Sequence, residues 1–171
     1  ANPAKILVDP YARRISGTVT DLEAARGWTI DPMTGPPCTR DSLGHVPLSV
    51  ITAPAAPLIR SGPDVPWSEI VIAEVHVRGF TMRHPEVPPE QRGTYLGLGH
   101  PAVVAHLHRM GVTAVELLPV TATLNEPQLL QRGVTNYWGY STLGFFAPHP
   151  GYASVPGAEI EEFQAMVDAL H

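Results

Sequence analysis

The amino-acid sequence predicts an α/β fold, and three consecutive segments carry the prediction. Residues 70–80 and 112–120 are rich in β-branched and other apolar residues, which favours strands. The segment Pro101–Met110 between them has the periodicity of an amphipathic helix. A helix that joins two neighbouring strands of one sheet makes them parallel, with a right-handed crossover. We therefore expect a βαβ unit in the second half of the chain.

The first 66 residues predict little regular structure. Two short extended segments are expected, Lys5–Val8 and Arg14–Thr20, the second because of its β-branched residues. From residue 31 to residue 66 the chain is rich in Pro, Gly and Ser, with one apolar island at 48–51. Because proline fixes φ and lacks an amide donor, this part is predicted to be an irregular connector.

The first predicted strand of the βαβ unit, Ile70–Phe80, begins with a continuous apolar run and then alternates. The alternation places Glu74, His76 and Arg78 on one face, which indicates a strand with two environments. A long loop, Thr81–Gly99, is expected to follow because it contains three prolines and three glycines. A loop of this length in a compact domain is usually functional or part of an insertion.

The helix and the second strand have clear sequence signals. Pro101 fits the first turn of a helix, where a missing N–H is not needed. Val103, Leu107 and Met110 form one apolar stripe along that helix. Gly111 is placed to end the helix, and the apolar segment after it is predicted to be a buried strand.

The C-terminal part predicts a loop that extends from Val120 to Tyr152, followed by a second helix, Glu159–Leu170. The apolar residues of this helix recur at helical spacing: Ile160, Phe163, Val167 and Leu170. A helix after the second parallel strand needs a third strand to return to, and two parallel strands leave their faces and edges open. We therefore expect a piece of a larger fold, which unfolds alone without a sharp cooperative thermal transition.

Composition limits the classes of partner. Acidic residues outnumber basic ones, 16 to 11, for a net charge of −5. This balance argues against nucleic-acid binding, which needs clustered Lys and Arg. No basic amphipathic segment or long apolar stretch suggests a membrane partner. The one cysteine, Cys38, cannot form an internal disulfide, so a cytoplasmic protein is the default expectation.

The most informative candidate for a binding site is an aromatic cluster beyond the second predicted strand. Tyr137, Trp138 and Tyr140 follow the carboxyl end of that strand, which is the end where α/β sheets and barrels bind ligands. Aromatic rings are good platforms for the apolar faces of sugars, and a tyrosine hydroxyl can bond to ligand oxygens. From the residues alone, packing of this loop onto the protein body is an equally good interpretation.

Eight histidines raise the question of a metal site, but their spacing is unfavourable. His106 and His108 are two residues apart on the predicted helix, so they point to different sides. Two metal ligands on one helix face would be four residues apart. We expect neither a metal nor another cofactor.

Two carboxylates lie within the predicted strands. Glu74 and Glu116, one in each strand, are candidate catalytic acids when each is considered alone. A buried carboxylate needs partners. We favour a structural role for both, as polar pairs with His76, Arg78 or backbone groups, because pairing is how buried charge is tolerated.

Several segments in order resemble glycoside hydrolase family 13, and within it the bacterial glycogen debranching enzymes and isoamylases. Those segments are Glu74–Thr81, Arg92–Gly99, Gly111–Val120, Asn136–Tyr140 and Phe145–Pro148. Residues 5–13 are similar, more loosely, to the end of the small β-sandwich that precedes the catalytic barrel in these enzymes.

The resemblance implies a partial (β/α)8 (TIM) barrel, of which this chain has the first two βα units, preceded by the tail of a β-sandwich module. Residues 1–30 would be the C-terminal part of that carbohydrate-binding-type module. Residues 31–66 would be the connector, and residues 67–171 the start of the catalytic barrel.

The resemblance also implies an activity, the hydrolysis of α-1,6-glucosidic branch linkages in glycogen or limit dextrin. Such enzymes retain anomeric configuration and use an aspartate nucleophile with a glutamate acid/base. By resemblance these residues lie on later strands, so no catalytic residue is assigned here and the chain alone is expected to be inactive. Tyr140 matches the tyrosine that stacks on the sugar at the cleavage subsite, and Trp138 and Tyr137 are further candidates for contact with the α-glucan.

Three alternatives stay open at this point. One is a branching enzyme or a trehalose-releasing relative of the same family. The second is a protein that binds α-glucans such as maltooligosaccharides without cleaving them. The third is a remnant without function.

Overall fold

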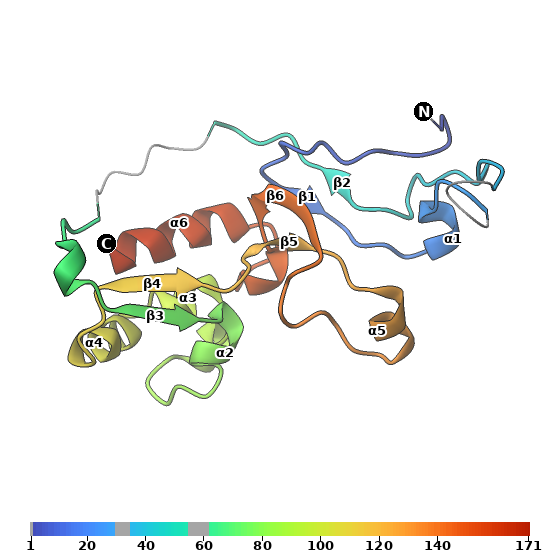
Figure 1. The fold of residues 1–171 in the computed structure, drawn as a ribbon. Helices are drawn as coiled ribbons and strands as arrows, with labels where there is room; N and C mark the ends of the chain where they lie inside the picture. Colours follow the sequence, from blue (N-terminus) through green and yellow to red (C-terminus); the bar gives the residue numbers. More distant parts are fainter. Residues whose placement is uncertain (1, 30–34, 55–61) are drawn as a thin grey trace.

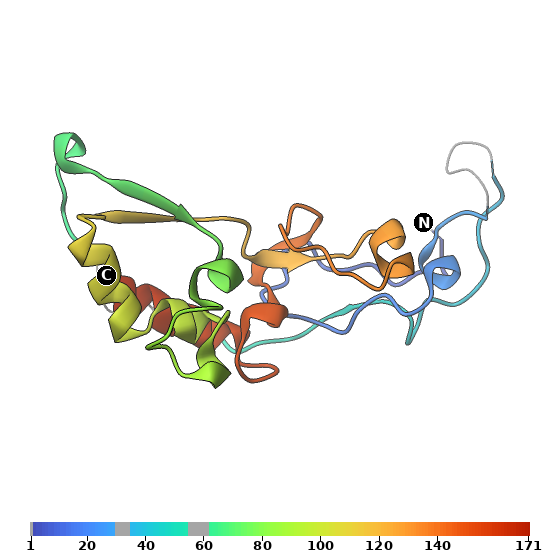
Figure 2. The same ribbon diagram turned by 90° about the horizontal axis from the view of Figure 1, so that it is seen from below.

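The computed structural model describes residues 2–29, 35–54 and 62–171. The molecule is elongated and has two parts, which Figure 1 shows side by side. One part contains a parallel pair of strands together with most of the helices, and the other contains two short antiparallel pairs. Figure 2 shows the same elongated outline from below, with the longest helix running along the parallel pair.

The predicted βαβ unit is present. Strand β3 (Ile72–Val75) pairs in parallel with β4 (Ala114–Leu117), residue by residue along their whole lengths. Helix α4 (Pro101–Arg109) connects them and has Pro101 in its first turn, as predicted. Gly111 lies just beyond the helix with a φ of +74°, a conformation that side chains with a Cβ rarely adopt. Both strands are confirmed, although each is shorter than the apolar run that predicted it.

The first strand is shorter because a helix begins where the alternation was expected to continue. β3 ends at Val75, and helix α2 spans Val77–Thr81. His76 stands between them, and its Nδ1 accepts hydrogen bonds from the amides of Arg78 and Gly79, both at 3.1 Å. This cap satisfies two amides that have no partner within the helix. The prediction that the alternating part of this segment is strand was wrong.

The segment predicted to be a long loop, Thr81–Gly99, is mostly loop but contributes several side chains to the core. It contains a 3-10 turn, η2 (Pro89–Gln91), and a short helix, α3 (Tyr95–Leu98). The side chains at both ends of α3 are fully buried, in the same cluster as the buried residues of β3 and α4. A helix this short is stabilised by the packing of its side chains and not by local propensity. The loop prediction is confirmed for most of the segment and wrong at Tyr95–Leu98, because proline and glycine content does not report the burial of those residues.

Helix α6 (Glu159–Leu170) has the predicted bounds but a different buried face. Its most buried residues are Glu159, Glu162 and Met166, whereas the apolar stripe is only half-buried. The carboxylate of Glu162 accepts hydrogen bonds from the amides of Ser154 and Val155 at 2.8 and 3.1 Å. Because these amides satisfy its charge, the carboxylate can be buried. Apolar periodicity cannot reveal such a residue.

The region after Val120 was predicted to be a single loop, and this prediction was wrong. Strands β5 (Thr121–Thr123) and β6 (Thr142–Pro148) form an antiparallel pair with an irregular register. Helix α5 (Pro127–Gln131) lies between them in sequence, and a 3-10 turn, η3 (Pro150–Tyr152), follows β6. The strand signal of β6 was weakened by the glycine within it.

The N-terminal region has little regular structure, as predicted. Strand β1 (Ile15–Ser16) lies in one predicted extended segment and pairs antiparallel with β2 (Leu48–Ser49), which lies in the apolar island. A short helix, α1 (Leu22–Ala25), was not predicted. No strand forms at residues 5–8, so that prediction was wrong.

The predicted connector is described only in part. Residues 31–34 and 55–61 lie outside the described residues. Between these gaps the chain is irregular apart from β2, and a 3-10 turn, η1 (Trp67–Glu69), precedes β3.

The N-terminal region packs against the β5–β6 pair and does not stand apart from it. Ile15 is buried in one apolar cluster with Ala12, Ala122 and Ala147. Gly144 of β6 allows the close approach, because a Cβ there would lie 2.5 Å from Cδ1 of Ile15. The predicted division at residue 30 stays a prediction.

Candidate functional site

The aromatic loop, residues 136–140, lies at the carboxyl end of the parallel strands. The backbone carbonyl of Tyr137 is 2.7 Å from Nε2 of His76, the residue that directly follows β3. In Figure 1 the segment between α5 and β6 extends from this end of the sheet. The loop therefore lies at the edge where parallel α/β structures bind ligands, as its sequence position predicted.

A network of polar side chains holds this loop. The side-chain oxygen of Asn125 accepts the amide of Asn136 at 2.7 Å, and Oδ1 of Asn136 accepts the amide of Gly139 at 2.9 Å. Glu126 accepts the side-chain amide of Asn136 at 3.0 Å and also the hydroxyl of Ser141. The backbone of the loop is thus fixed from inside by side chains on either side of the aromatic residues.

Two details strengthen this scaffold. The hydrogen bond from Ser141 lowers the pKa of Glu126 below its usual value, so Glu126 is a carboxylate near neutral pH and an acceptor only. Gly139 has a φ of +80° and lies against Pro119, whose carbonyl oxygen would be 3.1 Å from a Cβ on Gly139. A side chain at position 139 would therefore be strained in both conformation and space.

The three predicted site residues are brought together but are not equivalent. Tyr137 stacks on the imidazole of His76, with ring centroids 4.2 Å apart and planes 5° from parallel, so one of its faces is covered. Trp138 meets the rings of Tyr137 and His76 nearly at right angles, in T-shaped contacts. Tyr140 is 70 % exposed, more than Tyr137 at 45 % or Trp138 at 56 %. Among the described residues no ring stacks on Tyr140, so it presents a free aromatic face.

Behind the loop lies a buried group of tyrosines and histidines. Tyr152 meets His76, Tyr95 and His149 edge to face. The hydroxyl of Tyr95 donates to the carbonyl of His149, at 3.0 Å. Burial raises the pKa of Tyr95 and of Tyr152 and lowers the pKa of His149, so all three are neutral near pH 7. This group packs beneath the loop, in contact with it through His76.

Sequence reasoning missed three of the residues that build the site. His76 was assigned to a strand, and Glu126 and Asn136 were not singled out for any role in positioning the loop. The signal for His76 was its place three residues before Gly79, shortly after the apolar run that ends at Ala73. The signal for Asn136 was its place three residues before Gly139, the spacing of a side-chain-capped turn.

The strand carboxylates do not form the polar pairs that were predicted. Glu74 and Glu116 are exposed, and they lie directly opposite each other in the parallel ladder. Within the described ranges neither takes part in an ion pair. Like charges directly opposite destabilise a sheet. The prediction that they pair with His76 or Arg78 was wrong.

Two features, a metal-binding cluster and a membrane-spanning helix, are absent from the described residues. No three His, Cys, Asp or Glu side chains of the described part gather in a way that could hold a metal ion. No helix among the same residues has the length and apolar character needed to cross a membrane.

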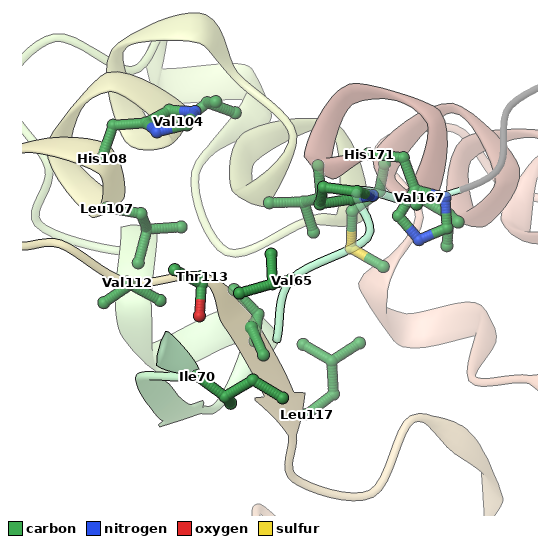
Figure 3. A pocket seen from close by; sticks show the side chains of 16 residues that line it. Val65, Ile70, Val104, Leu107, His108, Val112, Thr113, Leu117, Val167 and His171 are labelled. Atoms are coloured by element: carbon green, nitrogen blue, oxygen red, sulfur yellow. The ribbon is translucent and has the colours of Figure 1, made fainter. Parts of the chain in front are cut away.

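A cavity of about 630 Å³ lies away from the aromatic loop, between β4, α4 and α6 (Figure 3). Its lining is mostly aliphatic and includes Val65, Ile70, Val104, Leu107, Leu117 and Val167. The few polar groups are those of Thr113 and the two histidines His108 and His171. Sugars need many hydrogen-bond partners, so this cavity does not suit a glucan.

Comparison with known proteins shows which proteins the chain is similar to. The chain is 46 % identical over 176 aligned residues to a protein of Mycobacterium bovis named glycogen operon protein GlgX homolog, and 45 % identical over 171 residues to a glycogen debranching enzyme of Salmonella schwarzengrund. Each alignment covers 99 % of this chain but only 24 % and 25 % of the relative. The chain thus spans about a quarter of the length of these relatives.

Solved structures agree with the sequence comparison. The pullulanase of Paenibacillus barengoltzii matches with a TM-score of 0.63 and 21 % identity, over 96 % of this chain and 24 % of that chain. The type I pullulanase of Bacillus subtilis, in complex with maltose, matches with a TM-score of 0.55 and 28 % identity, over 96 % and 21 %. No protein-family model matches the chain. The identity of 45–46 % extends over 99 % of the chain, so the chain is homologous to a segment of the proteins named glycogen operon protein GlgX homolog and glycogen debranching enzyme, and its neighbours among solved structures are pullulanases.

Proposed function

We propose that this chain is the part of a glycogen-debranching hydrolase whose aromatic loop contacts an α-glucan. The observation that carries the proposal is the free face of Tyr140, at the carboxyl end of a parallel strand pair, in a chain 45 % identical to a glycogen debranching enzyme. An exposed ring with a rigidly held backbone is a suitable platform for a sugar ring.

The three aromatic residues take different roles in this proposal. Tyr140 stacks on a glucose unit next to the branch linkage, because both its exposure and its position favour contact. Trp138 offers a second, partly exposed surface for a neighbouring unit. Tyr137 supports the other two, since His76 covers one of its faces. Catalytic carboxylates are assigned to the rest of the full-length protein, by the resemblance and because the relatives are about four times longer.

We also propose that residues 67–171 begin a (β/α)8 barrel and that residues 1–30 end a β-sandwich module. The parallel pair with its connecting helix supports the barrel. The apolar cavity beside β4 supports it too, because aliphatic surface of this kind is suited to packing against further strands and helices (Figure 3). The single cysteine supports a cytoplasmic location.

We expect a full-length protein that contains this segment to hydrolyse α-1,6 linkages in glycogen limit dextrin, and the 171-residue chain to release no reducing ends above background. The reason is that a retaining glycosidase needs two positioned carboxylates, which the proposal assigns outside this chain. Reducing-end assays followed by chromatography of the products measure both. Hydrolysis by the purified 171-residue chain, with its full mass verified, would overturn the assignment of the catalytic carboxylates to the rest of the full-length protein.

The product analysis also separates the alternatives within the family. New α-1,6 branches would indicate a branching enzyme, and free trehalose would indicate a trehalose-releasing relative. Glucan binding by the full-length protein without any cleavage would favour a non-catalytic glucan-binding protein. The absence of both cleavage and glucan binding would favour a remnant without function.

A further inference from the structure

We propose that His76 is a positioning residue for the aromatic loop, held as the neutral tautomer with its proton on Nε2. In this form one imidazole joins the end of β3, the start of α2 and the backbone of the loop. The role in sugar contact rests on the proposed function, because it concerns the loop that carries Tyr140. The tautomer and the hold on the loop can be measured without a sugar.

The Nδ1 atom of His76 is an acceptor. It receives the amide hydrogens of Arg78 and Gly79, both at 3.1 Å. A backbone amide can only donate, so a proton on Nδ1 would face two donors and both hydrogen bonds would be lost. His76 is 7 % exposed, and water cannot readily replace these bonds.

The Nε2 atom is therefore the donor. Its nearest partner is the carbonyl oxygen of Tyr137, at 2.7 Å, and a carbonyl can only accept. The hydroxyl oxygen of Tyr152, at 3.3 Å, is a second and weaker acceptor for the same proton. One ring nitrogen thus accepts hydrogen bonds and the other donates, whereas an imidazolium would carry a proton on both nitrogens and could accept at neither.

Packing fixes the same arrangement in space. The ring of Tyr137 lies parallel on the imidazole, and Tyr152 meets the imidazole edge to face, with ring centroids 5.6 Å apart. Gly79 makes room for Tyr137, because a Cβ on Gly79 would lie 2.5 Å from the tyrosine hydroxyl. The backbone at Tyr137 is held by His76, and that at Gly139 is held by Asn136, so Tyr140 starts from a fixed position.

Two substitutions separate the tasks of the two nitrogens. In His76→Gln the side-chain amide nitrogen can replace Nε2 as the donor to Tyr137, but the Nδ1 acceptor is lost. In His76→Asn the side-chain oxygen can replace Nδ1 as the cap of α2, but the donor to the loop is lost. If His76 acts only as the cap of α2, the Asn variant keeps its function, because its side-chain oxygen supplies the same acceptor to the helix.

The first measurement is the imidazole ¹⁵N–¹H correlation spectrum of the 171-residue chain. We expect His76 to have a protonated Nε2 and a bare Nδ1. A proton on Nδ1 would overturn the proposal without any variant being made.

The second measurement compares hydrogen exchange of the Gly139 amide and affinity for maltoheptaose across the variants. We expect exchange about tenfold faster and binding about tenfold weaker in His76→Asn, because one hydrogen bond to a buried partner is worth about that factor. In His76→Gln both should stay within about threefold of the original chain. Equal behaviour of the two variants, or a greater loss in His76→Gln, would overturn the proposal.

The two readouts also distinguish this proposal from the proposed function. If the original chain does not bind maltoheptaose, the proposed sugar contact fails. The tautomer and the exchange of the Gly139 amide then decide the role of His76 on their own.

Discussion

Replacement of Gly97 by alanine is expected to lower the free energy of unfolding by about 3 kcal/mol, or to abolish the folded state. Gly97 is buried within α3, and a Cβ there would overlap the backbone carbonyl oxygen of Gln91 and lie 3.0 Å from Oγ1 of Thr81. Overpacking of a core costs about 1–3 kcal/mol and occasionally more. Here the obstacle is backbone, so the turn before α3 must move.

The measurement is urea unfolding of a full-length protein that contains this segment, followed by circular dichroism, because the isolated chain is not expected to unfold in a sharp transition. Gly27→Ala is the matched control. A Cβ on Gly27 would meet nothing within 4 Å, and its φ is not positive. An equal stability change in the two variants would show that α3 is not packed as described.

Replacement of Arg14 by alanine is expected to cost about 3 kcal/mol of stability. Nε of Arg14 lies 2.9 Å from Glu159, whose side chain is only 2 % exposed, and Nη2 lies 3.0 Å from Glu161. Nε of Arg14 is close enough to Glu159 for an ion pair, but its N–H does not point at the carboxylate as a hydrogen bond requires. The contribution of this contact is therefore electrostatic. Without Arg14 the carboxylate of Glu159 would stay buried and unpaired, and removal of one partner of a buried pair costs about 3–5 kcal/mol. The lower end applies because Arg14 is partly exposed.

The matched control for this pair is Arg26→Ala. Arg26 pairs with Glu23 at 3.0 Å, but both side chains are more than half exposed. Such a pair contributes at most about 1 kcal/mol. A second substitution, Glu159→Gln in the Arg14→Ala chain, should restore part of the stability because it removes the unpaired charge. No difference between Arg14→Ala and Arg26→Ala in urea unfolding would contradict the buried ion pair.

The sequence predicted those elements whose cause is local or periodic. Helices α4 and α6 followed from apolar spacing, and the end of α4 followed from Gly111, whose positive φ the structure confirms. The parallel pairing of β3 and β4 followed from a helix between two apolar runs. These features depend on backbone geometry that neighbouring residues impose.

Elements that depend on distant partners were missed. The strand β3 ends early because a single side chain, His76, caps the next helix. Helix α3 exists because Tyr95 and Leu98 are buried by residues from other elements. Glu159 faces inward because Arg14, far away in the sequence, neutralises it. No local pattern in the chain encodes such contacts.

The candidate site was predicted in its residues but not in its roles. Tyr137, Trp138 and Tyr140 are adjacent in sequence and were treated as similar candidates. The structure covers one face of Tyr137 with His76 and leaves Tyr140 free. This difference arises because His76 holds the carbonyl of Tyr137, a contact across 61 positions that spacing within the loop does not show.

The most direct test of the account is calorimetric titration of maltoheptaose into the 171-residue chain, its Tyr140→Ala variant and its Trp67→Ala variant. Trp67 is 88 % exposed and precedes β3, at the other end of the strand, so it controls for general loss of exposed aromatic surface. We expect the original chain and Trp67→Ala to bind equally and Tyr140→Ala to bind about tenfold more weakly, since an aromatic contact contributes about 0.5–1.5 kcal/mol. Equal affinity of all three, or no affinity in the original chain, would contradict the assignment of the aromatic loop as the glucan contact.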